Sequence, residues 1–136
     1  MKRWRGSVLA LGVFLAGCLF DSEPKGVAGT WIYEYDAFLS DALPYTKTYS
    51  FSESGSVRFE HRVVDAVVDS FSGTWSLQGD SLRTNRVSCS RPDSAGVFVP
   101  YECSGPPYDG ESVYWDGDRI YGVNSSNGMR QYYERK

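Results

Sequence analysis

The sequence contains few of the residues and motifs that catalysis and metal binding usually require. His61 is its single histidine, and there are only three cysteines. Zinc sites normally use three or four Cys and His ligands, so these side chains do not predict one. The chain also lacks the Gly-x-Ser-x-Gly, His-Glu-x-x-His and phosphate-loop motifs of common active sites. We therefore expect a non-enzymatic protein that holds neither a metal nor a cofactor.

Long apolar runs are missing as well. The main apolar stretch extends only from Val8 to Ala16, and it follows Lys2, Arg3 and Arg5. A basic start, a brief apolar stretch and small residues after it are the parts of an export signal. A membrane-spanning helix would need about 20 apolar residues. We therefore predict that residues 1–17 are a cleaved signal peptide; the alternative is a buried first helix.

The residues at the expected cleavage point resemble the lipobox of bacterial lipoproteins, an aliphatic residue followed by two small residues and an invariant cysteine. Here they read Leu15-Ala16-Gly17-Cys18. The resemblance implies that Cys18 receives a diacylglyceryl group and becomes the first residue of the mature protein, where its amino group is often acylated too, for example with palmitate. Two or three acyl chains suffice for stable anchoring. The expected partner is therefore a membrane, bound through the N-terminal lipid.

Residues 18–28 show no hydrophobic periodicity and contain Pro24 and Gly26, so we expect a short flexible tether. Ten such residues reach roughly 17 to 19 Å, which keeps the folded part close to the bilayer. In well-studied lipoproteins an Asp directly after the lipidated Cys retains the protein in the inner membrane. Leu19 stands there in this chain. By that resemblance we expect the outer membrane, at its periplasmic face or at the cell surface.

An excess of basic charge is absent too. Three of the 14 basic side chains lie in the predicted signal, which leaves 11 basic and 17 acidic side chains and a net charge of -6. Nucleic-acid binding requires clustered Lys and Arg that neutralise phosphates. We therefore do not expect nucleic acid to be a partner of this chain.

The odd number of cysteines is explained if Cys18 carries lipid. The remaining two, Cys89 and Cys103, would lie in a compartment that permits disulfides. A bond between them would close a loop of about 15 residues and stabilise the fold by roughly 3 kcal/mol in the chain-entropy model. We predict this disulfide; the alternatives are two separate buried thiols or part of a metal site.

Aromatic residues make up 15% of the chain and include ten Tyr and four Trp, a composition that favours strands. From residue 29 onward, short runs alternate between apolar and polar residues and are separated by turn residues. The predicted strands are residues 29–35, 45–52, 57–63, 71–77, 81–89, 97–103, 111–115, 119–123 and 129–134. Eight or nine consecutive strands are most stable when closed, because closure removes exposed edges. The predicted fold is all-β, a small antiparallel up-and-down barrel.

Three segments carry a further resemblance, to the lipocalin-like domains of small bacterial lipoproteins. They are Gly29-Thr30-Trp31, the run from Tyr49 to Val57, and the run from Gly73 to Leu82. The resemblance implies that residues 29–136 form a lipocalin-like barrel. The motifs that carry it lie between residue 29 and about residue 84. It also implies that Trp31 packs at the closed end of the barrel under a basic side chain from a late strand. Arg130 and Arg135 are both candidates for that side chain.

The alternation places many aromatic side chains on the inner face of the barrel. Our leading hypothesis is that they line a cavity for a small apolar ligand. The alternative is that they fill the barrel, which then acts through its outer surface as an interaction or inhibitory module. Lys47 and His61 also point inward, where they could hold an acidic head group or simply be a hydrogen-bonded His and a Lys that reaches solvent along its stem. The candidate ligand-binding residues are Trp31, Tyr33, Tyr35, Lys47, Tyr49, Phe59, His61 and Trp75.

Overall fold

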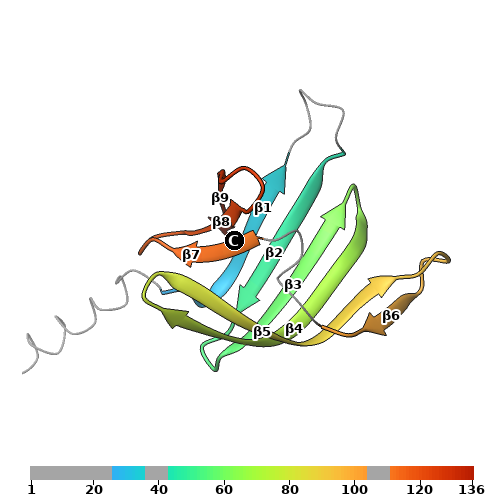
Figure 1. Ribbon diagram of the computed structural model, residues 1–136, viewed down its shortest axis with the longest axis horizontal. Helices are drawn as coiled ribbons and strands as arrows, with labels where there is room; N and C mark the ends of the chain where they lie inside the picture. The colour runs from blue at the N-terminus through green and yellow to red at the C-terminus, as the bar shows by residue number, and fades with distance from the viewer. Residues whose placement is uncertain (1–25, 36–42, 104–110) are drawn as a thin grey trace, which may run out of the picture.

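The computed structural model describes residues 26–35, 43–103 and 111–136 (Figure 1). The predicted signal peptide, Cys18 and most of the tether lie outside the described residues. In the described ranges the regular structure is all β. Within the same ranges, no helix has the length and hydrophobicity needed to cross a bilayer.

Ten strands form one antiparallel sheet in the described part of the chain. They are β1 (Gly29–Tyr35), β2 (Tyr45–Phe51), β3 (Ser56–Val63), β4 (Ala66–Gln78), β5 (Ser81–Pro92), β6 (Phe98–Tyr101), β7 (Glu111–Trp115), β8 (Ile120–Asn124), β9 (Arg130–Tyr132) and β10 (Glu134–Arg135). Their order across the sheet is β10-β1-β2-β3-β4-β5-β7-β8-β9, and β6 pairs with β5 off this path. The predicted up-and-down arrangement of antiparallel strands is confirmed.

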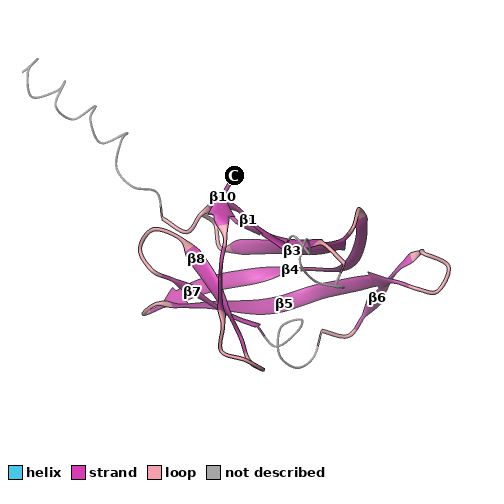
Figure 2. Ribbon diagram, turned by 90° about the horizontal axis from the view of Figure 1, so that it is seen from above, coloured by secondary structure: helices cyan, strands magenta, loops and turns pink. Residues whose placement is uncertain are grey.

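The C-terminal segment nearly closes the sheet into a barrel. β9 pairs with β8, β10 pairs with β1, and only Tyr133 separates β9 from β10. The buried Tyr133 donates its backbone N–H to the carbonyl of Ile120 at 3.0 Å, and Lys136 donates to the carbonyl of Thr30 at 2.9 Å. One short stretch therefore bonds to strands at both ends of the sheet. Figure 2 shows the sheet folded back on itself, with β1 and β10 on one side and β5 and β7 on the other.

The alternation of the sequence sets the two faces of the sheet. In β3 the side chains of Val57, Phe59 and His61 are buried, and the residues between them are more exposed. The pairing of the strands brings Tyr49, Phe59 and Phe71 into register across β2, β3 and β4. Aromatic residues from three strands therefore meet on the inner face, and the core forms there.

Two strand boundaries differ from the prediction by three residues or more. β4 begins at Ala66 rather than at Phe71, and β5 continues to Pro92 rather than ending at Cys89. The sequence contains no Gly, Pro or Asn where β3 turns into β4, so the turn was not recognised. Val64 makes this turn with φ of 58°, a conformation that β-branched residues rarely adopt.

Candidate functional site

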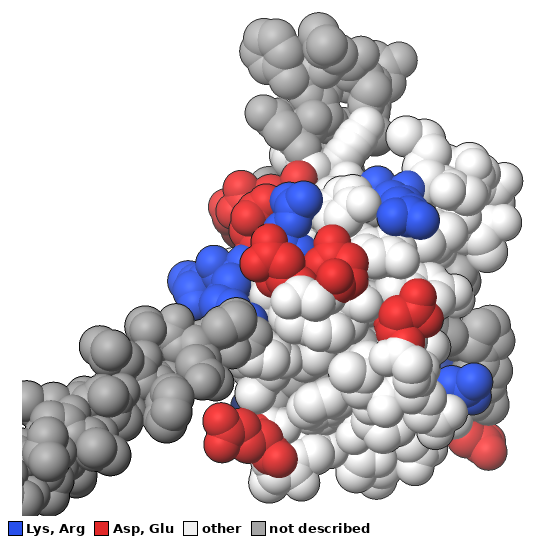
Figure 3. Space-filling model, turned by 90° about the vertical axis from the view of Figure 1, so that its left-hand side faces the viewer, with Lys and Arg blue, Asp and Glu red and all other residues white. Residues whose placement is uncertain are grey.

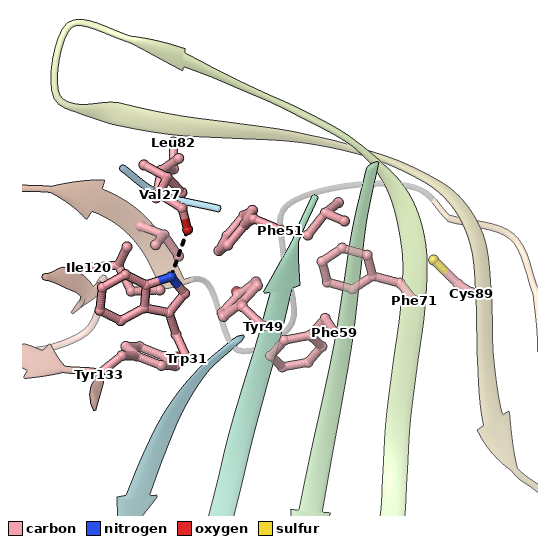
Figure 4. Packing of buried hydrophobic residues seen from close by; sticks show 12 residues of the cluster. Val27, Trp31, Tyr49, Phe51, Phe59, Phe71, Leu82, Cys89, Ile120 and Tyr133 are labelled. Atoms are coloured by element: carbon pink, nitrogen blue, oxygen red, sulfur yellow. Dashed lines mark hydrogen bonds between the residues drawn. The ribbon is translucent and has the colours of Figure 1, made fainter. Parts of the chain in front are cut away.

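Trp31 lies at the end of the barrel where β1 begins, here called the Trp31 end. It is fully buried, and its indole N–H donates to the carbonyl of Val27 at 2.8 Å (Figure 4). The guanidinium carbon of Arg135 lies 4.2 Å from the centre of the indole. Arg130 instead lies over the ring of Tyr121, at 4.6 Å. Arg135 is therefore the basic side chain that the resemblance to lipocalin-like domains implied.

The interior next to the Trp31 end is occupied by aromatic rings in direct contact (Figure 4). The ring of Tyr49 lies 4.7 Å from Phe59 and 5.6 Å from Tyr133, and Phe59 stacks on Phe71 at 5.1 Å. Aromatic pairs attract at centroid distances of about 4.5 to 7 Å. Trp31, Tyr49 and Phe59 were predicted to line a cavity, and the structure packs them into a shared hydrophobic cluster.

Trp75 is partly buried and contacts the turn between β2 and β3. Its indole N–H donates to the carbonyl of Ser52 at 2.9 Å, and its backbone N–H donates to the carbonyl of Gly55, also at 2.9 Å. Its ring meets the edge of Phe51 at 5.4 Å. This predicted ligand-binding residue therefore fastens a turn to the edge of the core.

Buried polar side chains lie toward the other end of the barrel, here called the Tyr45 end because β2 begins there. Lys47, His61 and Asp69 are cross-strand partners on β2, β3 and β4, and their exposed fractions are 3%, 7% and 3%. Burial of such groups is costly unless they are hydrogen-bonded. Tyr101 donates its O–H to Asp69 at 2.8 Å, and the Lys47 ammonium donates to the Gln131 amide oxygen at 3.5 Å. We call Lys47, His61 and Asp69 the inner polar row.

Tyrosine rings surround the inner polar row. Tyr45 meets His61 edge-on at 5.3 Å, and the Lys47 ammonium lies 5.8 Å from the centre of the Tyr45 ring. Tyr35 stacks on Tyr45 at 5.0 Å, and Tyr33 lies 6.2 Å from it. Four of the predicted ligand-binding residues, Tyr33, Tyr35, Lys47 and His61, are thus brought together at the Tyr45 end. An ammonium and an imidazole inside a barrel offer donors to a carboxylate or another acidic group.

Cys89 and Cys103 form the predicted disulfide, with a Cα–Cα distance of 5.5 Å. Cys89 is buried on β5, where it is the register partner of Tyr101 on β6. The bond therefore ties the end of the β5–β6 hairpin to the core. Cys103 lies two residues beyond Tyr101, whose O–H donates to Asp69. The disulfide therefore has a structural role, and it lies next to the inner polar row.

Asp116, in the turn between β7 and β8, has a carboxyl group whose pKa departs from its ordinary value. Its Oδ1 accepts the backbone N–H of Arg119 at 2.7 Å and that of Asp118 at 2.9 Å. These hydrogen bonds, the one from Arg119 foremost, lower the pKa of the Asp116 carboxyl below its ordinary 3.8. Across the described residues, no group of three or more His, Cys, Asp and Glu side chains is placed to bind a metal ion.

The seam between β5 and β7 is short. The two strands pair only at Ser81 and Leu82, opposite Tyr114 and Val113. A cleft of about 440 Å³ adjoins this pair, and it is lined by inner residues such as Tyr49 as well as by Arg83 and Arg86. The barrel thus has a side opening that reaches its core.

A larger cleft, of about 720 Å³, lies on the outer face of β2 to β5. We call it the outer cleft. It is lined by Thr48, Ser50, Arg58, Phe59, Glu60, Val67, Ser70, Phe71, Ser72, Ser88, Ser90 and Phe98. Sequence reasoning missed it, because the outward positions were read only as solvated. The sequence did contain a sign of the cleft: the outward positions of these strands carry short Ser and Thr side chains, where long charged ones are more usual.

Charged side chains of both signs are interspersed on the face of the molecule shown in Figure 3. Basic groups there lie next to acidic ones, and a broad area between them carries no charge. Nucleic acids bind instead to a continuous basic stripe or patch. This face therefore carries charges of both signs and no extended field of one sign.

Comparison with known proteins gives no family to which the chain can be assigned. No family model, no curated protein and no solved structure matches it.

Proposed function

We propose that the mature chain is a lipid-anchored, non-enzymatic domain of the bacterial cell envelope, held at the outer membrane by acylated Cys18, that binds a partner with the outer surface of a filled barrel. The sequence Leu15-Ala16-Gly17-Cys18 supports the anchor. One observation carries the choice of the outer surface. The inner aromatic residues from Trp31 to Phe71 contact one another and their neighbours, as a core does.

The packing of the interior supports this choice energetically. A ligand could enter the cluster only by displacing rings that already contact each other, and each buried aromatic side chain contributes about 3 to 5 kcal/mol to stability. Small eight-stranded barrels are commonly filled by their own side chains. The outer face, in contrast, carries the cleft of about 720 Å³.

Native mass spectrometry of the lipidated protein, extracted from cells in mild detergent, tests the filled barrel. We expect the mass of the polypeptide with its own covalent acyl chains and nothing further. A non-covalent lipid that survives gentle activation would contradict the proposal. The anchor is tested separately by metabolic labelling with palmitate. Wild type should be labelled and Cys18→Ser should not, and equal labelling of the two would overturn it.

A second candidate function is the binding of a small apolar ligand with an acidic head group inside the barrel. The inner polar row favours it, because Lys47 and His61 are buried side by side on neighbouring strands. The side opening between β5 and β7 would give such a ligand a route to Tyr49. Under this candidate, Lys47→Met should lose the co-purified mass that wild type carries. Lys136→Met, which changes an exposed lysine of the same chain, should keep it.

A further inference from the structure

We infer that the outer cleft binds a neutral oligosaccharide. The inference rests on the proposed function, since it names the kind of partner that the outer surface of the barrel would take. The volume of the cleft, about 720 Å³, lies within the range of about 300 to 1,000 Å³ typical of small-molecule sites.

The floor of the outer cleft is built from two rows of register partners. One row runs Ser50, Arg58, Ser72 and Ser88 across β2 to β5, and the next runs Thr48, Glu60, Ser70 and Ser90. Directly opposite residues in a sheet have Cβ atoms about 4.5 to 5.5 Å apart. Six short hydroxyl side chains therefore form a compact grid whose small size leaves the cleft open above it.

Hydroxyl groups suit a sugar because each both donates and accepts hydrogen bonds. The backbone groups of these strands are already used in the sheet, so the side chains must make the polar contacts. The hydroxyls of Ser70 and Ser90 hydrogen-bond to each other at 2.9 Å, which leaves the pair one O–H donor and several lone pairs for a ligand hydroxyl. A polyol presents donors and acceptors at similar spacing, whereas an acyl chain presents none.

Two charged side chains add directional contacts without a net charge. Arg58 and Glu60 both line the cleft, one offering donors and the other acceptors. Arg62, which does not line the cleft, donates to the Glu60 carboxylate at 2.5 Å and holds that carboxylate in place. An anionic ligand would meet Glu60 as well as Arg58. This balance favours a neutral ligand over a phosphate or a carboxylate.

Phe98 supplies an apolar surface at one side of the cleft. It is the register partner of Pro92 and therefore lies on the same face of the sheet as Ser90. Its side chain is 46% exposed although it is large and apolar. The negative face of an aromatic ring can pack on the C–H face of a sugar ring. A site of hydroxyls, an arginine, a carboxylate and one open aromatic ring matches the mixed surface of a saccharide.

Other partner classes fit the cleft less well. Protein–protein interfaces are enriched in Tyr, Trp, Phe, Met and Arg and depleted in Ser, the opposite of this floor. A lipid tail would cover hydroxyl groups and leave them without hydrogen bonds. A nucleic acid would find only Arg58 as a cation among the cleft residues.

Isothermal titration calorimetry tests the inference, with the full-length lipidated protein in detergent micelles and soluble tetrasaccharides of glucose, of galactose and of N-acetylglucosamine. We expect at least one of them to bind. Arg58→Ala and Phe98→Ala should each raise its Kd tenfold or more. Arg130→Ala is the matched control, because Arg130 is an exposed strand arginine that is not part of the outer cleft. It should leave the Kd unchanged.

A second variant fills the cleft without touching the core. Ser72→Tyr places a strand-favouring aromatic residue on the outer face and should abolish binding while the circular dichroism spectrum and melting temperature stay near those of wild type. The inference falls if no tetrasaccharide binds wild type, or if Arg58→Ala and Arg130→Ala weaken binding equally. A bare barrel in mass spectrometry that binds no saccharide would leave the proposed function standing and remove this inference alone.

Discussion

Arg135 and Trp31 are register partners on β10 and β1, and the guanidinium lies over the indole at 4.2 Å. The same guanidinium donates to the carbonyls of Ala28 at 2.8 Å and Gly26 at 2.6 Å. Gly29 makes room for it, since a Cβ atom there would lie 2.7 Å from an Arg135 nitrogen. The first and last strands are thus joined by one side chain as well as by the backbone.

Arg135→Ala should lower the free energy of unfolding by about 2 kcal/mol, because it removes the cation–π contact and hydrogen bonds to two carbonyls. Urea denaturation followed by Trp fluorescence measures the loss. Arg130→Ala is the matched control, since Arg130 is exposed and lies over the ring of Tyr121. It should cost about 0.5 to 1 kcal/mol. Equal losses in the two variants would show that Arg135 has no special role in closing the barrel.

Gly73→Ala should destabilise the fold by about 1 to 3 kcal/mol through overpacking. A Cβ atom at Gly73 would lie 1.9 Å from the backbone oxygen of Asn85, at the bulge where the pairing of β4 with β5 shifts register, so the strands must separate. Gly26→Ala meets no atom within 4 Å and should change stability by less than about 0.5 kcal/mol. Thermal denaturation of both variants provides the comparison, and an unchanged melting temperature for Gly73→Ala would rule out the close approach.

The double variant Cys89→Ala/Cys103→Ala should be less stable than wild type by about 3 kcal/mol, because the closed loop no longer restricts the unfolded chain. Reduction of the wild-type protein should produce a loss of similar size. Chemical denaturation with and without reductant measures both. If reductant destabilised the double variant as much as wild type, the effect could not come from this bond.

Asp116→Asn should lower the melting temperature near neutral pH and have no effect in strong acid. The pKa of Asp116 is lower in the folded protein than its ordinary 3.8, mainly because of the hydrogen bond from Arg119. The carboxylate therefore stabilises the turn above pH 3.8, and that stabilisation disappears as the pH falls through the lower folded pKa. Melting curves from about pH 6 to pH 2 measure the gap between the two proteins. A gap that stayed constant with pH would contradict this assignment.

The sequence predicted the strands best where apolar and polar residues alternate strictly. Residues 29–35 and 111–115 were predicted with the bounds that the structure has. The turn at Val64 was missed because its backbone conformation normally requires glycine, and the sequence has valine there. Local pattern cannot reveal a turn that the pairing of two long strands imposes on an unsuited residue.

Contacts between distant residues were harder to predict than strands. Arg130 lay inside the last predicted strand, residues 129–134, and Arg135 directly after it, whereas the structure splits this segment at Tyr133 and pairs Arg135 with β1. Lys47 and His61 were assigned to the inner face from their alternation, and the structure places them there. Asp69 was not expected beside them, because β4 was predicted to begin after it. The outer cleft depends on the register of four strands, which alternation alone does not give.

The division of one C-terminal stretch between β8 and β1 has a consequence for how the chain reaches its native state. Until residues 130–135 are available, β1 and β8 each present a row of unsatisfied backbone groups that invite pairing with another molecule. A chain in which residues 130–135 are still unpaired is therefore an open ribbon with two exposed edges, and the pairing of β9 with β8 and of β10 with β1 covers both of them.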